Sequence, residues 1–435
     1  MKNAFKFLIF GMMLVSSMAI TSIAQTPEEC TPIYDKFLAN RKGPELEKFK
    51  TAVAAGKEYL EKCKDLDAAD VKEYINKQLP KLEVVVRDAE LYNQFNAAVP
   101  AQKWDDAFAS GRQLVGFYPD SLDIILVLAS IGFDNATAAP PVDKFNGEAI
   151  NYAKMALQKM NEGKVSDNFG AFVYTYKTKD CPDGKTNATG WMNYTIGKIM
   201  FDRMNQKKDS LPYLYKATQA GCETKDKIAE VYRTIGAWYI DEFKRLENDK
   251  NAKYAELQTL EKITPPDPKF PEVEKQYNDL VALQKGYMER VMDAYARAYK
   301  IANANIKTDA KYKEALLNNA KKFYGFRNGE ANIGGFDAWL SGVTAKPFPD
   351  PTSAVAPVVE TTPTTTGTPT AMTVSSESPA NTAASTDTRP RTAPTTTTAT
   401  TAKPAATTTP ATTEATTTAK KAPAKKPAPK KKGTR

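Results

Sequence analysis

Histidine is missing from all 435 residues of the chain. A Ser-His-Asp triad, a histidine general base and a zinc site with imidazole ligands all require that side chain, because imidazole titrates near neutrality and offers a ring nitrogen to a metal. Catalysis could then use only carboxylate, Tyr, Lys, Ser or Cys chemistry. The chain also lacks a G-x-S-x-G elbow and a G-x-x-x-x-G-K-[ST] phosphate loop. These absences favour a protein that is not an enzyme and that holds no cofactor or metal.

An excess of one charge is missing from the body of the chain. The whole chain carries 60 basic and 51 acidic residues, a net charge of +9. Residues 351–435 hold eleven of the basic and four of the acidic residues, and the first 24 residues hold two lysines, which leaves 47 of each sign in residues 25–350. A balanced body has no net field that would attract a polyanion. We therefore do not expect the body to bind nucleic acid.

No long hydrophobic run follows the N-terminus. Residues 1–24 contain two lysines, an apolar run from Phe7 to Ile20 and the small-x-small sequence Ser22-Ile23-Ala24. This pattern is typical of a cleaved secretory signal peptide. A membrane anchor is the alternative, but the run is shorter than the roughly 20 residues that span a bilayer. We expect a periplasmic or extracellular protein whose mature chain has no transmembrane segment.

Cysteine is scarce, since the chain has four and no two of them are spaced as C-x-x-C. Cys30 and Cys63 lie on the apolar faces of two neighbouring predicted helices, and Cys181 and Cys222 flank a second such pair. Four cysteines allow three pairings, and this placement favours the disulfides Cys30–Cys63 and Cys181–Cys222. Export to an oxidising compartment favours disulfides as well. A zinc site with four thiolates is the alternative, although structural zinc sites usually contain C-x-x-C pairs.

The period-two alternation that marks a strand is not found in the body of the chain. Apolar residues instead recur every three or four positions, as on one face of a helix. They include Leu46, Phe49, Val53 and Leu60 in one segment, Ile228, Val231, Ile235 and Trp238 in another, and Val273, Tyr277, Leu280, Tyr287, Val291 and Ile301 in a third. Short breaks at Lys42-Gly43-Pro44 and at the prolines of residues 265–271 end these segments. The predicted fold class is all-α, built from antiparallel helical hairpins.

Small residues recur where predicted helices would cross. The segments are Trp104-Asp105-Asp106-Ala107 with Leu114 and Pro119, Leu128-Ala129 with Ala149, Ala153 and Ala156, Ile196-Gly197, Ile235-Gly236, and Tyr312-Lys313-Glu314-Ala315. In these segments residues 85–330 resemble the tetratricopeptide repeat (TPR) family, and the chain looks like an exported bacterial member. The resemblance implies hairpins stacked as an α-solenoid whose concave surface binds a peptide or a partner's helix. An irregular helical bundle without true repeats is the alternative.

Aromatic and basic residues gather on two of the predicted helices. They are Trp191, Tyr194 and Lys198 on the first, and Tyr232, Arg233 and Trp238 on the second. In a solenoid these helices would line the concave side, where such residues can hold a peptide. The alternative is ordinary packing between neighbouring repeats.

Large apolar residues are nearly absent from the end of the chain. Residues 346–419 are rich in Thr, Pro and Ala, a composition that predicts a disordered linker. The basic tail, residues 420–435, has no acidic residue and eight basic ones: Lys420, Lys421, Lys425, Lys426, Lys430, Lys431, Lys432 and Arg435. It could bind an anionic envelope polymer or a membrane surface, or simply solubilise the chain. The predicted organisation is a signal peptide over 1–24, a helical-repeat domain over 25–345, the linker and the basic tail.

These patterns together predict an exported, non-enzymatic scaffold or adaptor that binds a protein or peptide in the cell envelope. The first alternative is a protein that binds polyanions or anchors to the envelope through its basic tail. The second is a cell-wall enzyme with an unrecognised site. Salt separates the first two hypotheses, because contacts with a polyanion weaken steeply as ionic strength rises.

Overall fold

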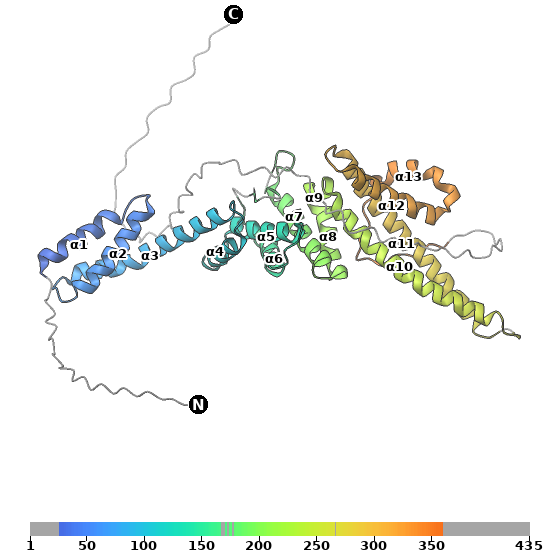
Figure 1. Cartoon of the computed structure of the whole chain (residues 1–435), viewed down its shortest axis with the longest axis horizontal. Coiled ribbons are helices and arrows are strands. Elements are labelled where there is room, and N and C mark those ends of the chain that lie inside the picture. Colours follow the sequence, from blue (N-terminus) through green and yellow to red (C-terminus); the bar gives the residue numbers. More distant parts are fainter. Residues whose placement is uncertain (1–25, 167–169, 172–173, 176–177, 266, 360–435) are drawn as a thin grey trace, which may run out of the picture. The chain divides into compact units, whose positions relative to one another are not determined.

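The computed structural model describes residues 26–166, 170–171, 174–175, 178–265 and 267–359 (Figure 1). These residues are predominantly helical, which confirms the predicted all-α class. The first helices are α1 (Pro27–Asn40), α2 (Leu46–Lys62), α3 (Ala69–Ala98), α4 (Trp104–Phe117), α5 (Leu122–Thr137) and α6 (Asn146–Asn161). They are followed by α7 (Gly184–Asp202), α8 (Lys207–Ala220), α9 (Cys222–Asp226), α10 (Ala229–Leu260), α11 (Phe270–Ala304), α12 (Ala310–Asn328) and α13 (Phe336–Gly342). Two 3-10 helices, η1 (Glu330–Gly335) and η2 (Val343–Ala345), flank α13.

One short β pairing lies between α6 and α7. Strand β1 (Gly170–Ala171) runs antiparallel to β2 (Tyr174–Thr175), with Gly170 opposite Thr175. Strand β1 contacts α5, and β2 contacts α7. The sequence gives no period-two signal here, because two residues per strand are too few to produce one.

Local sequence explains where several helices begin and end. Helix α1 starts with a capping box, in which the amide of Thr26 donates to Glu29 Oε2 at 3.2 Å. Asp183 caps α7 by accepting a hydrogen bond from the amide of Thr186 at 3.2 Å. The proline-rich break predicted near residues 265–271 separates α10 from α11. These ends agree with the helical segments that the sequence predicts.

Each helix packs mainly against its neighbours in the chain (Figure 1). Helix α1 packs against α2, α5 against α6, α7 against α8, and α10 against α11, while α6 also contacts α7 and α11 contacts α12. Most connections are short, so partner helices run antiparallel. The predicted helical hairpins are therefore present. In the described part of the chain, no α-helix contacts extensively another that is more than three places away in sequence.

Buried apolar side chains form two separate cores. The small core takes side chains from α1, α2 and the first half of α3. Its members are Cys30, Phe37, Ala52, Ala55, Tyr59, Cys63, Ile75, Leu79 and Leu82. The large core takes side chains from Leu91 on α3 to Phe348, beyond α13. Helix α3 therefore contributes to both cores.

Both predicted disulfides are present. Cys30–Cys63 joins α1 to the end of α2, with Cα atoms 6.0 Å apart. Cys181–Cys222 joins the segment before α7 to the start of α9, with Cα atoms 6.1 Å apart. Disulfides are compatible with an exported protein. Over the described ranges, no helix combines the length and the apolar character needed to cross a membrane.

The folded part of the chain continues past residue 345, where composition predicts the start of a linker. The side chain of Phe348 is 5% exposed, and its ring meets that of Tyr232 edge-on with centroids 5.1 Å apart. The amide of Val358 donates to the carbonyl of Ala282 on α11 at 2.9 Å. We call residues 346–358 the C-terminal strap. Amino-acid composition does not predict the strap, because one anchoring aromatic side chain hardly changes an average. Residues 360–419 of the expected linker and the basic tail lie outside the described residues.

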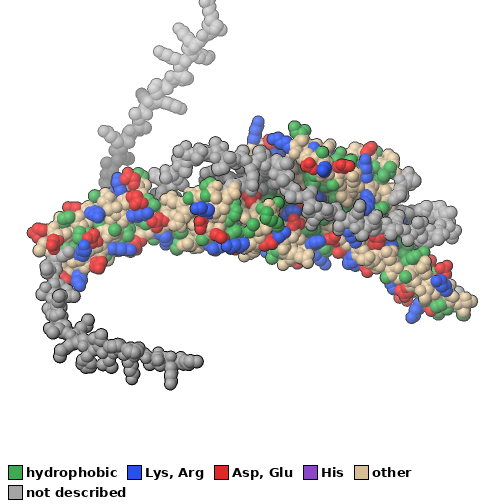
Figure 2. Space-filling view, in the orientation of Figure 1, with side chains coloured by type: hydrophobic (Ala, Val, Ile, Leu, Met, Phe, Trp, Pro, Cys, Tyr) green, Lys and Arg blue, Asp and Glu red, His purple; other side chains and the backbone are tan. Residues whose placement is uncertain are grey.

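Charged side chains of both signs are interspersed over the described helices (Figure 2). Many pair between neighbouring helices, as Lys57 on α2 does with Glu83 on α3 at 2.7 Å. The mixture agrees with the equal numbers of basic and acidic residues in the body of the chain.

Candidate functional site

The six side chains predicted to line a groove lie on α7 and α10, and most are buried. Trp191, Tyr194 and Lys198 are 0%, 4% and 7% exposed, and Tyr232 is 4% exposed. Only Arg233 and Trp238 are half-buried, as are many residues at helix interfaces. The four buried residues do not line an open groove. They contribute to packing between neighbouring helices, which is the alternative interpretation of the sequence pattern.

The aromatic residues of α7 are covered by a neighbouring hairpin. The ring of Phe133 on α5 lies 6.2 Å from that of Trp191 and 5.3 Å from that of Tyr194 between centroids. The indole Nε1 of Trp191 also donates to Glu223 Oε2 at 2.8 Å. Edge-to-face and tilted aromatic contacts of this kind stabilise packed helices. Trp191 therefore holds three elements together, which a partner-binding side chain could not do while remaining free.

The two basic residues of the predicted groove join a buried charge cluster around Glu230 of α10. Lys198 Nζ donates to Glu230 Oε1 and to Asp202 Oδ2, at 2.6 Å in both cases. Arg233 donates to both carboxylate oxygens of Glu230, from Nε to Oε2 at 2.6 Å and from Nη2 to Oε1. From α12, the Tyr312 hydroxyl donates to Glu230 Oε2 at 3.0 Å. These five residues, the Glu230 cluster, connect α7, α10 and α12.

Electrostatics fix the protonation states of Glu230, Arg233 and Tyr312 in this cluster. Burial alone would raise the pKa of Glu230, but the charges of Arg233 and Lys198 outweigh it and hold the pKa well below its ordinary value. The carboxylate in turn raises the pKa of the Arg233 guanidinium. Burial raises the pKa of Tyr312, so its hydroxyl stays protonated and donates. The cluster is a fixed ion-pair network at neutral pH, and Glu230, Arg233 and Tyr312 are not tuned to exchange protons there.

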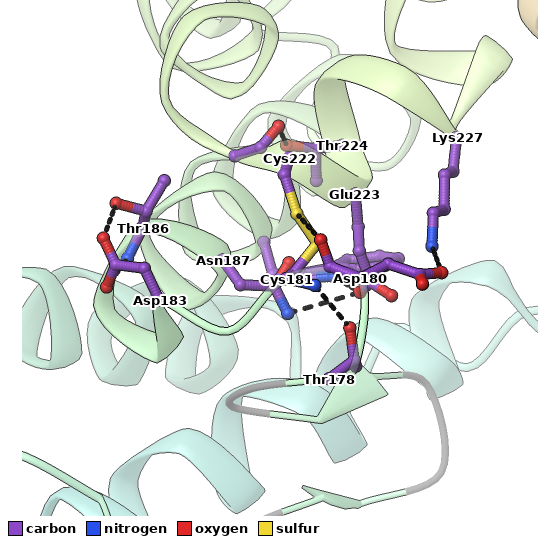
Figure 3. The surroundings of a disulfide bond; sticks show 12 residues. Thr178, Asp180, Cys181, Asp183, Thr186, Asn187, Cys222, Glu223, Thr224 and Lys227 are labelled. Atoms are coloured by element: carbon purple, nitrogen blue, oxygen red, sulfur yellow. Dashed lines mark hydrogen bonds and ion pairs between the residues drawn. A yellow bond between two sulfur atoms is a disulfide. The ribbon is translucent and has the colours of Figure 1, made fainter.

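Figure 3 shows the polar groups around the disulfide between Cys181 and Cys222. The amide of Cys181 donates to Thr178 Oγ1 at 3.1 Å, and Lys227 pairs with Asp180 at 2.7 Å. All four cysteines of the chain are paired, so none is available as a thiolate nucleophile or as a zinc ligand. Among the residues that the structure describes, no group of three or more acidic or thiol side chains is arranged to hold a metal ion. This region is a structural joint between α7 and α9.

An exposed aromatic surface lies where α3 meets the end of α4. Tyr92, Phe117 and Tyr118 are 37%, 46% and 36% exposed. The guanidinium of Arg87 lies 3.6 Å from the centroid of the Phe117 ring, a cation–π contact. The Tyr118 hydroxyl donates to Asp88, which Arg87 also contacts at 2.7 Å. We call Arg87, Tyr92, Phe117 and Tyr118 the α3–α4 surface. No pattern in the sequence predicts this surface, because its residues come from α3 and from the end of α4.

Three helical hairpins cross at a glycine that follows an isoleucine, where the partner helix leaves no room for a Cβ atom. A Cβ atom there would lie 2.2 to 2.7 Å from a side chain of the partner helix, and a fully buried isoleucine precedes each glycine. The pairs are Ile131-Gly132 on α5, Ile196-Gly197 on α7 and Ile235-Gly236 on α10, which meet Ala149, Leu214 and Tyr295 respectively. The second and third pairs are among the small residues predicted at helix crossings, whereas Ile131-Gly132 was not predicted although it is the same dipeptide.

The residues of the predicted polyanion site, Lys420 to Arg435, lie outside the described residues. The structure thus brings Lys198 and Arg233 together in a buried network and leaves the α3–α4 surface open to solvent. Comparisons of the chain with protein-family models, with curated proteins and with solved structures find no match.

Proposed function

We propose that the mature protein is an exported, non-enzymatic scaffold or adaptor that binds other proteins through a TPR-like array of helical hairpins. The observation that carries the proposal is the recurrence of one helix crossing, an Ile-Gly pair against the partner helix, in α5–α6, α7–α8 and α10–α11. Arrays of similar hairpins that pack in chain order offer extended surfaces for peptides and proteins. The local packing of the described helices agrees with such an array.

The α3–α4 surface supplies the chemistry for contact with a protein partner. Aromatic residues and Arg carry much of the binding energy at protein interfaces. Here Arg87 is held over Phe117 and against Asp88, so little side-chain freedom remains to be lost on binding. The proposal therefore assigns partner contact to this surface in place of the buried residues of α7.

Affinity capture from the envelope fraction tests the proposal. The baits are the full mature chain, a chain that ends at Val359, and the double variant Phe117→Ala/Tyr118→Ala. We expect the same proteins to bind the first two baits at low and high salt, and the double variant to lose them. Ile306→Ala is the matched control, since Ile306 is an isolated side chain that is 92% exposed.

Three outcomes would contradict the proposed function or its assignment to this surface. Capture that disappears with residues 360–435 and weakens steeply with salt indicates binding of a polyanion by the basic tail. Capture that the double variant retains in full removes the α3–α4 surface from the proposal. Release of fragments from cell-wall material by the purified chain would show an enzyme instead.

A further inference from the structure

A cleft of about 710 Å³ opens between α11, the end of α12, α13 and the C-terminal strap. Such a volume is in the range of sites that bind small ligands or single side chains with their backbone. The walls include Arg290 on α11, Trp339 on α13, Lys346 at the start of the strap and Val355 further along it. The cleft involves none of the residues of the α3–α4 surface.

The strap is a firmly built wall of this cleft. The Arg297 guanidinium donates to the carbonyl of Val343 at 2.8 Å and to that of Lys346 at 2.6 Å. Further along, the strap passes so close to α11 that a Cβ atom on Gly286 would lie 2.3 Å from the carbonyl oxygen of Ala356. Phe348, buried in the large core, anchors the strap between these two points. A ligand would therefore meet a preformed wall, which lowers the entropic cost of binding.

The carboxylates of the cleft are already neutralised by arginines. Glu289 pairs with Arg327 Nε at 2.9 Å, and Asp293 pairs with Arg297 Nε at 2.5 Å. Within the described ranges, neither Arg290 nor Lys346 has a carboxylate within 4.0 Å. Asp293 interacts with both cations only at longer range. Three basic side chains, Arg290, Arg327 and Lys346, line the cleft against two acidic ones, Glu289 and Asp293, so the lining keeps an excess of one positive charge.

The accessible part of the Arg290 guanidinium is weakly bonded. Its Nη2 donates to the hydroxyl of Ser353 at 3.3 Å, whereas its Nη1 is buried on the side of the Tyr239 hydroxyl and faces away from a ligand. An anion that reaches Nη2 from the cleft would form a charge-assisted hydrogen bond that the long contact with Ser353 does not supply.

Aromatic side chains form the apolar side of the cleft. The ring of Trp339 is half-buried and packs 5.6 Å from Tyr324 and 5.8 Å from Phe336 between centroids. Both Trp339 and Tyr324 line the cleft, and Val355 and Val358 of the strap add aliphatic surface. The cleft thus combines an excess of positive charge with an aromatic and aliphatic wall.

We propose that this cleft binds a carboxylate attached to an apolar side chain. Arg290 and Lys346 contact the carboxylate, and the side chain packs on Trp339. The C-terminus of a polypeptide and a free small carboxylic acid share this chemistry. The site goes beyond the proposed scaffold function, because it names the chemistry of a ligand and uses different helices.

Isothermal titration calorimetry of the mature chain with N-acetyl-phenylalanine and with its amide tests the site. We expect the acid to bind and the amide to bind at least about tenfold more weakly, because the amide cannot form charge-assisted hydrogen bonds. Lys346→Met should weaken binding of the acid by about tenfold, and Arg290→Met by at least as much. Lys311→Met, which removes an exposed lysine outside the cleft, should leave binding unchanged.

One further comparison and a folding control complete the test. The peptide Gly-Ser-Ala-Phe with a free carboxylate identifies a polypeptide terminus if it binds about tenfold more tightly than N-acetyl-phenylalanine, and a small acid if the affinities are equal. Circular dichroism checks folding, and Lys346→Met decides the matter if Arg290→Met is unfolded, since Lys346 is exposed. Equal binding of acid and amide, no heat with millimolar acid, or full affinity of Lys346→Met would each overturn the proposal.

Discussion

The small core and the large core are stabilised in different ways. In residues 26–82 every buried side chain is apolar, and the disulfide between Cys30 and Cys63 is part of the core. The large core contains buried charges, among them Glu230 and Arg297, each 8% exposed. A buried charge must keep its partners, since losing one costs several kcal/mol. The small core therefore depends on apolar packing and one covalent bond, whereas helix positions in the large core also depend on ion pairs.

Glu230→Ala should show this dependence most strongly. The substitution leaves Lys198 and Arg233 without their shared carboxylate and removes the acceptor of the Tyr312 hydroxyl. We expect the free energy of unfolding of the large core to fall by about 3–5 kcal/mol. Tryptophan fluorescence during urea unfolding measures it, because all four tryptophans of the chain lie in or against the large core.

Asp241→Ala is the matched control for Glu230→Ala. Asp241 on α10 pairs with Lys207 on α8 at 2.7 Å, but the two side chains are 43% and 37% exposed. Such pairs contribute at most about 1 kcal/mol, so the change should be small. A loss for Glu230→Ala no larger than for Asp241→Ala would show that the Glu230 cluster gives the large core no net stability.

Removal of each disulfide compares the two cores directly. The closed loops span 33 and 41 residues, so loop entropy assigns a similar stabilisation of about 4 kcal/mol to both bonds. The small core has few other buried contacts, and we expect Cys30→Ser/Cys63→Ser to unfold α1 and α2, which contain 14 and 17 residues. Far-UV circular dichroism should report the lost helix while tryptophan fluorescence stays native.

Cys181→Ser/Cys222→Ser should instead lower the melting temperature and leave the helix content native. The hydrogen bond from Trp191 to Glu223 still links α7 to α9 in that variant. Gly190 and Gly221 also approach so closely there that a Cβ atom on Gly190 would lie 2.5 Å from the Cα atom of Gly221. Equal loss of helix in the two disulfide variants would contradict the difference between the cores.

The helices and the disulfides could be predicted from the sequence because both are set by short-range patterns. The spacing of Val273, Tyr277 and Leu280 follows the helical repeat whatever packs against it. The pairing of Cys30 with Cys63 follows from a hairpin with a short break. The C-terminal strap could not be predicted from the sequence. Its position depends on the packing of Phe348 against Tyr215 and Tyr232, which lie more than one hundred residues earlier in the chain.

The prediction that residues of α7 and α10 line an open groove was wrong for a related reason. Helical spacing places Trp191, Tyr194 and Lys198 on α7 but does not reveal what covers them. Glu230, the partner of Lys198, comes 32 residues later in the sequence. Tyr312 reaches the same carboxylate from another 82 residues along the chain. Burial of a helix face by later segments is a property of the tertiary structure, so the burial of these residues became visible only there.

A glycine-to-alanine substitution in each core gives the comparison with the smallest expected effects. A Cβ atom on Gly132 would lie 2.2 Å from the Cβ atom and 3.3 Å from the Cα atom of Ala149. Helix α6 would have to move, so we expect Gly132→Ala to reduce the free energy of unfolding by about 1–3 kcal/mol. Amide hydrogen exchange in α5 and α6 should show the loss locally.

Gly56→Ala in the small core should cost much less. Its Cβ atom would meet side-chain atoms of Leu79 and Phe37 at 3.2 Å, and these can shift by a few tenths of an ångström. Alanine also stabilises a helix interior by about 1 kcal/mol relative to glycine, which offsets the tighter contact. Exchange in α2 should then stay within about twofold of the unsubstituted chain. A loss as large as that for Gly132→Ala would mean that close helix crossings, and not buried ion pairs alone, stabilise both cores alike.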